Sequence, residues 1–295
     1  MVMKLERLLL LLVLTVLYTT AFTQRREIAS FIKVSNIKYA TYPNADPNLN
    51  TLNVYMPKRG SNSPLIIWIH GGSWADGDKE EVHTKAEFFT SKGFVFVSIN
   101  YRLSPKVKHP VHVQDVANAI MWVYSNAKHY SADQNKIFLM GQSSGAHLAA
   151  MVSINEEYLK KTGSTPKIIR GMVLIDGMGF DIPAIISDAS KQLKGWFAQA
   201  FGNSSFDWRQ GSPINFVNSN NHIPATMFVY SGEDEVTEIE TKILYSKLVD
   251  EKVPCKIFHY PKKSQASLNK DLGKNDDKPT EEVLRFMLER MALKN

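Results

Sequence analysis

The sequence has one cysteine among its 295 residues, which excludes an intramolecular disulfide. Cys255 lies in a strand-like stretch, residues 254–260, where a buried thiol without chemistry is the expected role.

Charged residues of one sign do not cluster in the sequence either. The 35 Lys and Arg residues are scattered against 29 Asp and Glu residues, for a net charge of +6. Without a basic block, nucleic-acid binding is not expected.

Motifs for cofactors are also missing. The sequence shows neither the ligand spacing of a metal site nor a glycine-rich nucleotide fingerprint, so no metal and no cofactor is expected. Internal repeats and low-complexity linkers do not occur. A hydrophobic content of 44% over this length suits one large core, which predicts a single domain over residues 24–295.

One long apolar run is present, at the N-terminus. Lys4 and Arg7 precede the apolar residues 8–17, and small or polar residues follow up to Thr23. This pattern predicts a signal peptide over residues 1–23 and an exported protein, periplasmic or secreted. The run is shorter than the ~20 apolar residues of a membrane span, so no stable span is expected after the leader is removed. An uncleaved anchor is the alternative.

Alternating strand and helix patterns follow the leader. Continuous apolar runs at 64–69 and 94–99 are typical of strands buried on both faces of a parallel sheet. The fold class is therefore predicted to be α/β, with a mostly parallel central sheet flanked by helices. Further strands are expected at 31–37, 51–56, 136–140, 168–175, 225–230 and 255–260, and helices at 80–91, 113–127, 238–250 and 279–293.

Residues 177–222 lack a strong strand pattern, and their aromatic residues include Trp196, Phe197, Phe201, Phe206 and Trp208. This insertion is predicted to be a small helical cap over the site. Its aromatic rings suit either ordinary packing or contact with a substrate, and the sequence leaves both roles open.

The motif that organises the chain is Gly141-Gln142-Ser143-Ser144-Gly145, directly after the apolar residues 137–140. Gly-x-Ser-x-Gly between a strand and a helix is typical of a nucleophile elbow, which exposes the serine hydroxyl on a tight turn. Side chains two residues before and after Ser143 would collide in such a turn, so glycine is expected at both places.

A second motif, His70-Gly71-Gly72-Ser73-Trp74, follows the strand at 64–69. Two glycines directly after a buried strand allow backbone N–H groups to turn toward a developing oxyanion without steric obstruction.

With these motifs the sequence resembles α/β-hydrolases of the esterase, lipase and kynurenine-formamidase-like group, over nearly all of the chain after the leader. The resemblance extends to Asn100-Tyr101-Arg102-Leu103 and to Ser212-Pro213-Ile214. It implies an α/β-hydrolase fold and a carboxylesterase-like serine hydrolase for a small ester or amide. It also implies that Ser143 is the nucleophile and that the N–H groups of Gly72, Ser73 and Ser144 form the oxyanion hole. His70 and His147 would be structural.

The rest of the triad departs from the family pattern. The acid is expected three residues after Gly232, where this chain has Glu235, with Asp234 immediately before it. The general base is expected in the loop after the last strand, where Gln265 stands at the histidine position. Glutamine cannot accept a proton near neutral pH. Among the eight histidines, His259 is the best substitute by position.

Two functions remain open on this basis. The first is an exported ester or amide hydrolase that acts through Ser143 and is weakened by the loss of the histidine. The second is a catalytically silent relative that binds a ligand or a protein partner in the old pocket.

Overall fold

An eight-stranded sheet runs through the computed structural model, which describes residues 31–293. The strand order is β1-β2-β4-β3-β5-β6-β7-β8. The pairs β1–β2 and β2–β4 are antiparallel and all other pairs are parallel, which confirms the predicted mostly parallel sheet. The strands are β1 Phe31–Lys38, β2 Thr51–Pro57, β3 Ser63–Ile69, β4 Val95–Ile99, β5 Ala132–Gln142, β6 Ile169–Ile175, β7 Thr226–Ser231 and β8 Cys255–Tyr260.

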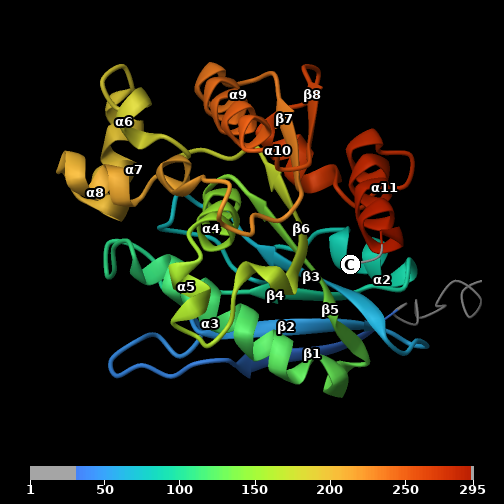
Figure 1. Cartoon of the computed structure of the whole chain (residues 1–295). Helices are drawn as coiled ribbons and strands as arrows, with labels where there is room; N and C mark the ends of the chain where they lie inside the picture. Colours follow the sequence, from blue (N-terminus) through green and yellow to red (C-terminus); the bar gives the residue numbers. More distant parts are fainter. Residues whose placement is uncertain (1–30, 294–295) are drawn as a thin grey trace, which may run out of the picture. The chain divides into compact units, whose positions relative to one another are not determined.

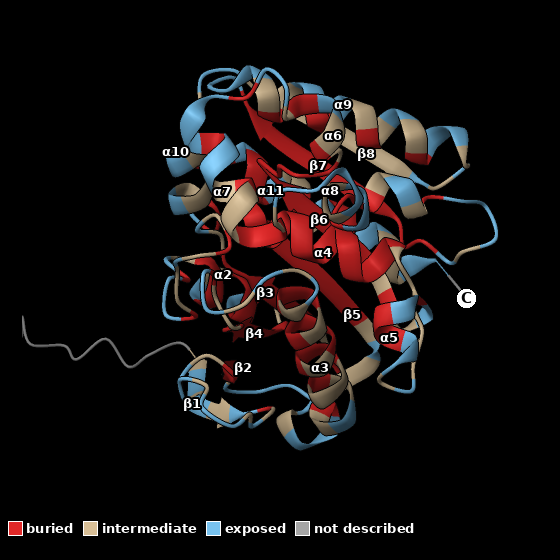
Figure 2. Ribbon diagram, turned by 90° about the vertical axis from the view of Figure 1, so that its left-hand side faces the viewer, coloured by how far each residue is buried: buried red, intermediate tan, exposed pale blue. Residues whose placement is uncertain are grey.

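Helices cover both faces of the sheet (Figure 1). One face packs against α3, α4 and α9, and the opposite face packs against α2, α10 and α11. Residues that alternate along β3 belong to two separate cores, with Ile67 in the first and Ile66 in the second. This two-sided burial explains why the central strands are continuous apolar runs without polar alternation. Figure 2 shows the same pattern, with α4 and the central strands buried.

The helices follow the predicted order. They are α2 Lys85–Ser91, α3 Val111–Asn126, η1 Ala127–Tyr130, α4 Ser144–Ile154, α5 Glu157–Lys160, η2 Pro166–Ile168, α6 Ile182–Ile185, α7 Lys191–Phe201, α8 Ser205–Gln210, η3 Pro213–Phe216, α9 Glu235–Asp250, α10 Gln265–Asp271 and α11 Lys278–Ala292. The expected helix at 80–91 begins only at Lys85. Asp78 accepts the backbone N–H groups of Glu80 and Glu81 through its side chain and its carbonyl, and these bonds hold the preceding residues in turns.

Residues 177–222, the predicted cap, contain α6, α7, α8 and η3, which lie together at one side of the sheet in Figure 1. Within the described part of the chain, no helix has the length and apolar character to cross a membrane. The predicted signal peptide lies outside the described residues.

Candidate active site

Ser143 occupies a sharp turn between the end of β5 and the start of α4. Its backbone has φ +53° and ψ −123°, a left-handed φ that non-glycine residues rarely adopt. The Ser143 N–H donates to the carbonyl of Ile175 on β6 at 2.9 Å, and this bond holds the turn against the neighbouring strand. Backbone strain of this kind is typical of functional sites, where the surrounding structure holds it in place.

Both glycines of the motif are required by close backbone contacts. A Cβ on Gly141 would lie 2.3 Å from the carbonyl oxygen of Gly145, and a Cβ on Gly145 would lie 2.1 Å from the carbonyl oxygen of Ile69. The structure therefore confirms the steric prediction for both glycines.

The loop after β3 lies directly beside Ser143. A Cβ on Gly71 would be 3.2 Å from the Cβ of Ser143, so backbone and nucleophile are in near contact. Gly72 and Ser73 have φ values of +114° and +51°. Their N–H groups donate to no backbone carbonyl among the described residues. Ser144 is the first residue of α4, where an N–H has no acceptor within the helix. The three predicted oxyanion-hole residues thus lie on the two segments that meet at Ser143.

Aromatic and histidine side chains fix this loop. The Trp74 indole N–H donates to Nδ1 of His147 at 3.2 Å, and Nε2 of His147 donates to the carbonyl of Gly211 at 2.7 Å. His147 is fully buried on α4, and burial lowers its pKa to about 3. The His70 ring stacks on Tyr101, whose hydroxyl donates to the His70 carbonyl at 3.0 Å. These contacts give both histidines structural roles, because their rings are buried and neutral.

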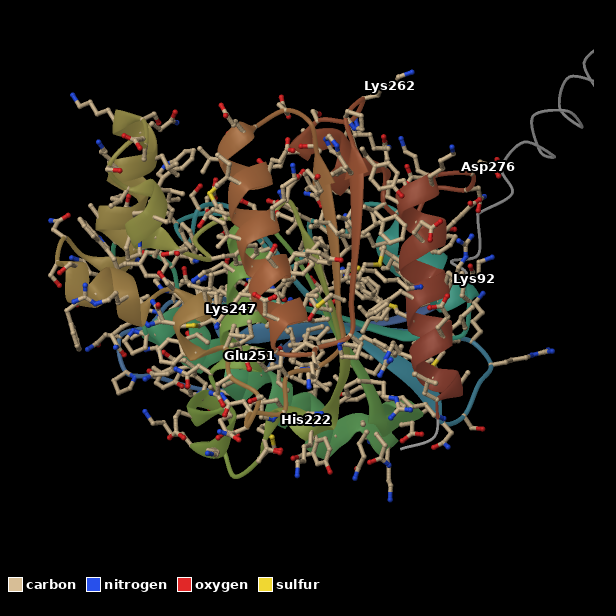
Figure 3. All side chains as sticks on the ribbon, turned by 45° about the horizontal axis from the view of Figure 1, so that its top comes forward. Lys92, His222, Lys247, Glu251, Lys262 and Asp276 are labelled. Carbon is tan, nitrogen blue, oxygen red and sulfur yellow. The ribbon has the colours of Figure 1, made fainter. Side chains whose placement is uncertain are left out.

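The remaining histidines of the described chain form no hydrogen bond with Ser143. His109 is hydrogen-bonded to Tyr158, and burial lowers its pKa to about 4. His112 is hydrogen-bonded to Ser104, and burial lowers its pKa to about 3. His222 lies near the amino end of β7, the opposite end from Lys262, which follows β8 (Figure 3).

His259, the best substitute by sequence position, is exposed on β8 and stacks on Tyr230 with ring centroids 4.5 Å apart. No histidine in residues 31–293 is hydrogen-bonded to Ser143.

Gln265 is half-buried as the first residue of α10, after the N-cap Ser264. Its backbone N–H donates to the carboxylate of Glu233 at 2.8 Å. Asp234 instead caps α9 by accepting the N–H groups at the start of that helix, and Glu235 is exposed as its first residue. The structure therefore brings Gln265 together with Glu233, and it shows no hydrogen bond from Gln265 to Asp234, Glu235 or Ser143.

A further carboxylate next to the elbow was not predicted from the sequence. Asp176 follows β6 directly, with φ +42° and only 1% of its surface exposed. Its Oδ1 accepts the N–H of Ser231 at 2.7 Å, whereas its Oδ2 is buried without a hydrogen-bond partner. Burial raises the pKa of Asp176 to about 6, and the nearby Glu233 and Asp234 add to this rise. The signal in the sequence was an acidic residue directly after a buried strand.

The loop after Asp176 is anchored from α9. Both carboxylate oxygens of Glu240 accept backbone N–H groups, from Gly179 at 2.6 Å and from Asp181 at 2.9 Å. Glu240 is fully buried, and this burial raises its pKa to about 7 against the opposing effect of the two N–H donors. The contact fixes the β6–α6 loop, and with it the segment that follows Asp176.

Aromatic residues of the predicted cap pack against the oxyanion loop. The rings of Phe197 and Phe201 on α7 contact Trp74, with centroids 5.7 and 4.9 Å apart. Both phenylalanines are buried, whereas Phe206 on α8 is 62% exposed. For the two α7 residues the structure thus shows the packing role that the sequence left open.

A small polar cavity of about 120 Å³ borders the same loop. Backbone and side-chain atoms from the oxyanion loop, from Gln142 and from Asn269 of α10 line it, together with Trp68, Asp76 and Glu81. Residues 31–293 contain no group of three or more His, Cys, Asp or Glu side chains placed to hold a metal ion.

Comparison with known proteins places these features in a family. The BD-FAE family model matches residues 52–248, which include both motifs. A kynurenine formamidase from Meyerozyma guilliermondii is 30% identical over 237 residues, 75% of this chain and 84% of that protein. The esterase LipQ of Mycobacterium tuberculosis is 36% identical over 97 residues, 32% of this chain and 23% of that protein. The chain spans less than half the length of several of the curated relatives it matches.

Solved structures share the fold. Esterase B from Lactobacillus rhamnosis, in an inhibited form, superimposes with a TM-score of 0.74 at 20% identity and covers 97% of this chain and 96% of its own. The thermophilic carboxylesterase EstE1 superimposes with a TM-score of 0.69 at 21% identity, over 91% of this chain and 90% of its own. The family match, the relatives and the sheet order agree, and the chain belongs to the BD-FAE family of esterase-like α/β-hydrolases.

Proposed function

We propose that the protein is a serine hydrolase of the carboxylesterase type that cleaves a small ester or amide through Ser143 and is weakened by Gln265. The observation that carries this proposal is the strained elbow at Ser143, which faces the loop of Gly72 and Ser73. In this reaction the Ser143 hydroxyl attacks the carbonyl carbon, and the N–H groups of Gly72, Ser73 and Ser144 stabilise the oxyanion.

Loss of the histidine sets the expected rate. Removing the histidine of a Ser-His-acid triad costs about a millionfold in turnover, or about 8 kcal/mol of transition-state stabilisation. Oxyanion stabilisation and binding retain about a thousandfold over water. The wild-type protein should therefore hydrolyse activated esters slowly, at rates between those of a functional triad and the uncatalysed reaction.

The cavity beside the oxyanion loop is lined by Gly72 and Gln142 but not by Ser143, so it does not define the size of the substrate. The names of the relatives agree with ester and amide chemistry, since they include an arylesterase from Saccharolobus solfataricus and kynurenine formamidases.

The second candidate function is a catalytically silent relative that binds a ligand or protein partner in the former catalytic pocket at Ser143, and Gln265 is the observation that favours it. Labelling with a fluorophosphonate separates the two, because it requires an activated serine and no knowledge of the substrate. Covalent labelling of the wild type that is lost in Ser143→Ala supports the hydrolase. A wild type that stays unlabelled, with an intact fold, supports the silent relative.

We also propose that the protein is exported after cleavage of residues 1–23. The proposal rests on the basic residues Lys4 and Arg7, the apolar run that follows and the small residues before Gln24. Mass spectrometry of the protein recovered outside the cytoplasm tests it. An N-terminus near Gln24 is the expected result, and an intact Met1 on a membrane-bound product contradicts it.

A further inference from the structure

Lys85, the first residue of α2, is buried without an acidic partner. Its exposed fraction is 0%, and no ion pair within residues 31–293 includes it. The other buried lysine of the described chain, Lys79, lies close enough to Asp78 to lower the pKa of that carboxyl. Burying an ammonium group without a counter-charge costs free energy, because water no longer solvates it. Such groups are more frequent at functional sites than elsewhere.

The Lys85 side chain binds the C-terminal turn of α10. Its Nζ donates to the carbonyl of Asn269 at 2.5 Å and to the Oδ1 of the same residue at 2.8 Å, and it lies 4.5 Å from the centre of the Trp68 ring. The neighbouring Thr84 donates its hydroxyl to the carbonyl of Leu272 at 3.0 Å. Carbonyls in the last turn of a helix have no acceptor role within that helix. Two residues at the start of α2 therefore cap the C-terminal end of α10.

The other end of α10 lies at the candidate active site. The helix begins with Gln265 at the expected histidine position, and the N–H of this residue is bonded to Glu233 in the turn after β7. Asn269 also lines the small cavity that Gly72 and Gln142 line. A movement of α10 away from α2 would therefore displace residue 265 relative to the nucleophile elbow.

From these contacts we infer that Lys85 is a positioning residue for the candidate active site, and that the loss of its proton tightens the docking of α10 on α2. The effect on catalysis rests on the proposed hydrolase function. When α10 moves away, Lys85 reaches water and its ammonium form regains its hydration. Protonation thus favours the undocked state, and the neutral amine, which still has N–H groups for Asn269, favours the docked state.

Burial separates the two states of Lys85. It lowers the pKa of this residue from 10.5 to about 7. The two oxygens of Asn269 and the ring of Trp68 favour the ammonium form, but none of them carries a full charge. Between pH 7 and pH 10.5 the docked state binds fewer protons than the undocked state, so docking becomes tighter as the pH rises through this range.

The charged groups around the contact do not reverse this effect. The helix α10 contributes Lys270 and Asp271, and Asp271 is paired with two other lysines. The strand β3 carries no titratable residue. On the side of α2, Glu87 is exposed, and the pKa of His83 is lowered by burial and by the nearby Lys85 and Lys270. A proton on His83 adds a like charge, so it acts in the same direction as a proton on Lys85.

Amide hydrogen exchange of the whole protein tests the docking, because protection of the α10 amides reports its local opening. After correction for the intrinsic pH dependence of exchange, protection in the wild type should rise from about pH 7 to about pH 8.5, approaching tenfold per pH unit. Lys85→Met should make it independent of pH. Lys85→Gln, which keeps a donor for Asn269 without a titratable charge, should give the same flat profile.

Two matched controls should keep the wild-type profile. Lys92→Met removes an exposed lysine at the end of the same helix, labelled in Figure 3. His83→Gln removes a group that titrates below the range of the measurement. For catalysis, the ratio of the wild-type kcat/KM to that of Lys85→Met, with p-nitrophenyl acetate, should rise with pH in parallel with the protection of α10.

The outcomes separate this inference from the proposed function. Protection of α10 that does not change with pH in the wild type, or that still changes in both Lys85 variants, overturns the inference. A kcat/KM ratio that stays constant while protection rises overturns the positioning role. Turnover that is unchanged in Ser143→Ala overturns the proposed function, and the exchange measurement still decides the docking of α10.

Discussion

The backbone N–H of Gln265 donates to the carboxylate of Glu233 at 2.8 Å, which ties the first residue of α10 to the turn after β7. The family resemblance expects the base of a triad at Gln265 and the acid in the same turn as Glu233, at Glu235 or Asp234. The connection between the two loops is therefore present, although an amide side chain stands where an imidazole is expected. A single substitution at Gln265 should then restore a base without rebuilding the loops.

Gln265→His should raise the rate of aryl-ester hydrolysis by at least about a hundredfold, the lower end of general-base contributions. Glutamine and histidine are similar in size, and residue 265 is half-buried at the start of α10. Steady-state kinetics of the wild type and the variant measure the gain.

Two controls accompany that measurement. The gain should vanish when Ser143→Ala is added, because the new imidazole has to act on this hydroxyl. His259→Ala should leave the wild-type rate unchanged, since His259 is exposed and stacks on Tyr230. Fast wild-type turnover that His259→Ala abolishes would show that the base lies on β8.

Asp176→Asn should make the protein more stable at neutral pH. The folded-state pKa of Asp176 is raised from 3.8 to about 6, so the folded protein binds this proton more tightly than the unfolded chain. The stabilisation is present below pH 3.8 and is lost as the pH rises through about 6. Above that range the ionised carboxylate costs up to about 3 kcal/mol, from 1.36 kcal/mol per pKa unit, and the amide removes this cost.

Denaturant unfolding of the wild type and Asp176→Asn at an acidic and a neutral pH measures this difference. The two proteins should have similar stability at the acidic pH, and the variant should be more stable at the neutral pH. A variant that is less stable at neutral pH would mean that Asp176 is held for structure.

The sequence predicted the parts of the site that backbone geometry dictates. Glycine is required at positions 141 and 145 because a side chain there would collide with the backbone of the elbow. The strands before Ser143 and before His70 are apolar because they are buried on both faces of the sheet. These signals are local, so a single sequence carries them.

Long-range contacts could not be derived in this way. Asp176 faces Ser231, 55 residues further along the chain, and Glu233 meets Gln265 after 32 residues. Glu233, Asp234 and Glu235 are neighbours in one turn, and their partners are decided by the start of α9. Asp234 is not free to reach Gln265, because its side chain caps this helix. The sequence could place the acidic turn but could not assign its members.

Trp74→Phe should destabilise the protein by about 1–3 kcal/mol, because it leaves Nδ1 of the buried His147 without a donor. It should also slow hydrolysis, since Trp74 fixes the loop that carries Gly72 and Ser73. Trp196→Phe is the matched control, as Trp196 is half-buried on α7 and makes no side-chain hydrogen bond in the described structure. Equal denaturation midpoints for the two variants would contradict a role for the Trp74–His147 bond.

Gly145→Ala should prevent a native elbow, because the added Cβ would lie 2.1 Å from the carbonyl oxygen of Ile69, a backbone atom that cannot move aside cheaply. Gly195→Ala offers the opposite case within the same protein. Gly195 lies inside α7 with nothing within 4 Å of the added Cβ, so alanine should stabilise the helix by up to about 1 kcal/mol. Thermal unfolding and fluorophosphonate labelling of both variants measure the contrast. A Gly145→Ala protein that unfolds at the wild-type temperature and is labelled as fast would show that the turn does not need glycine at this position.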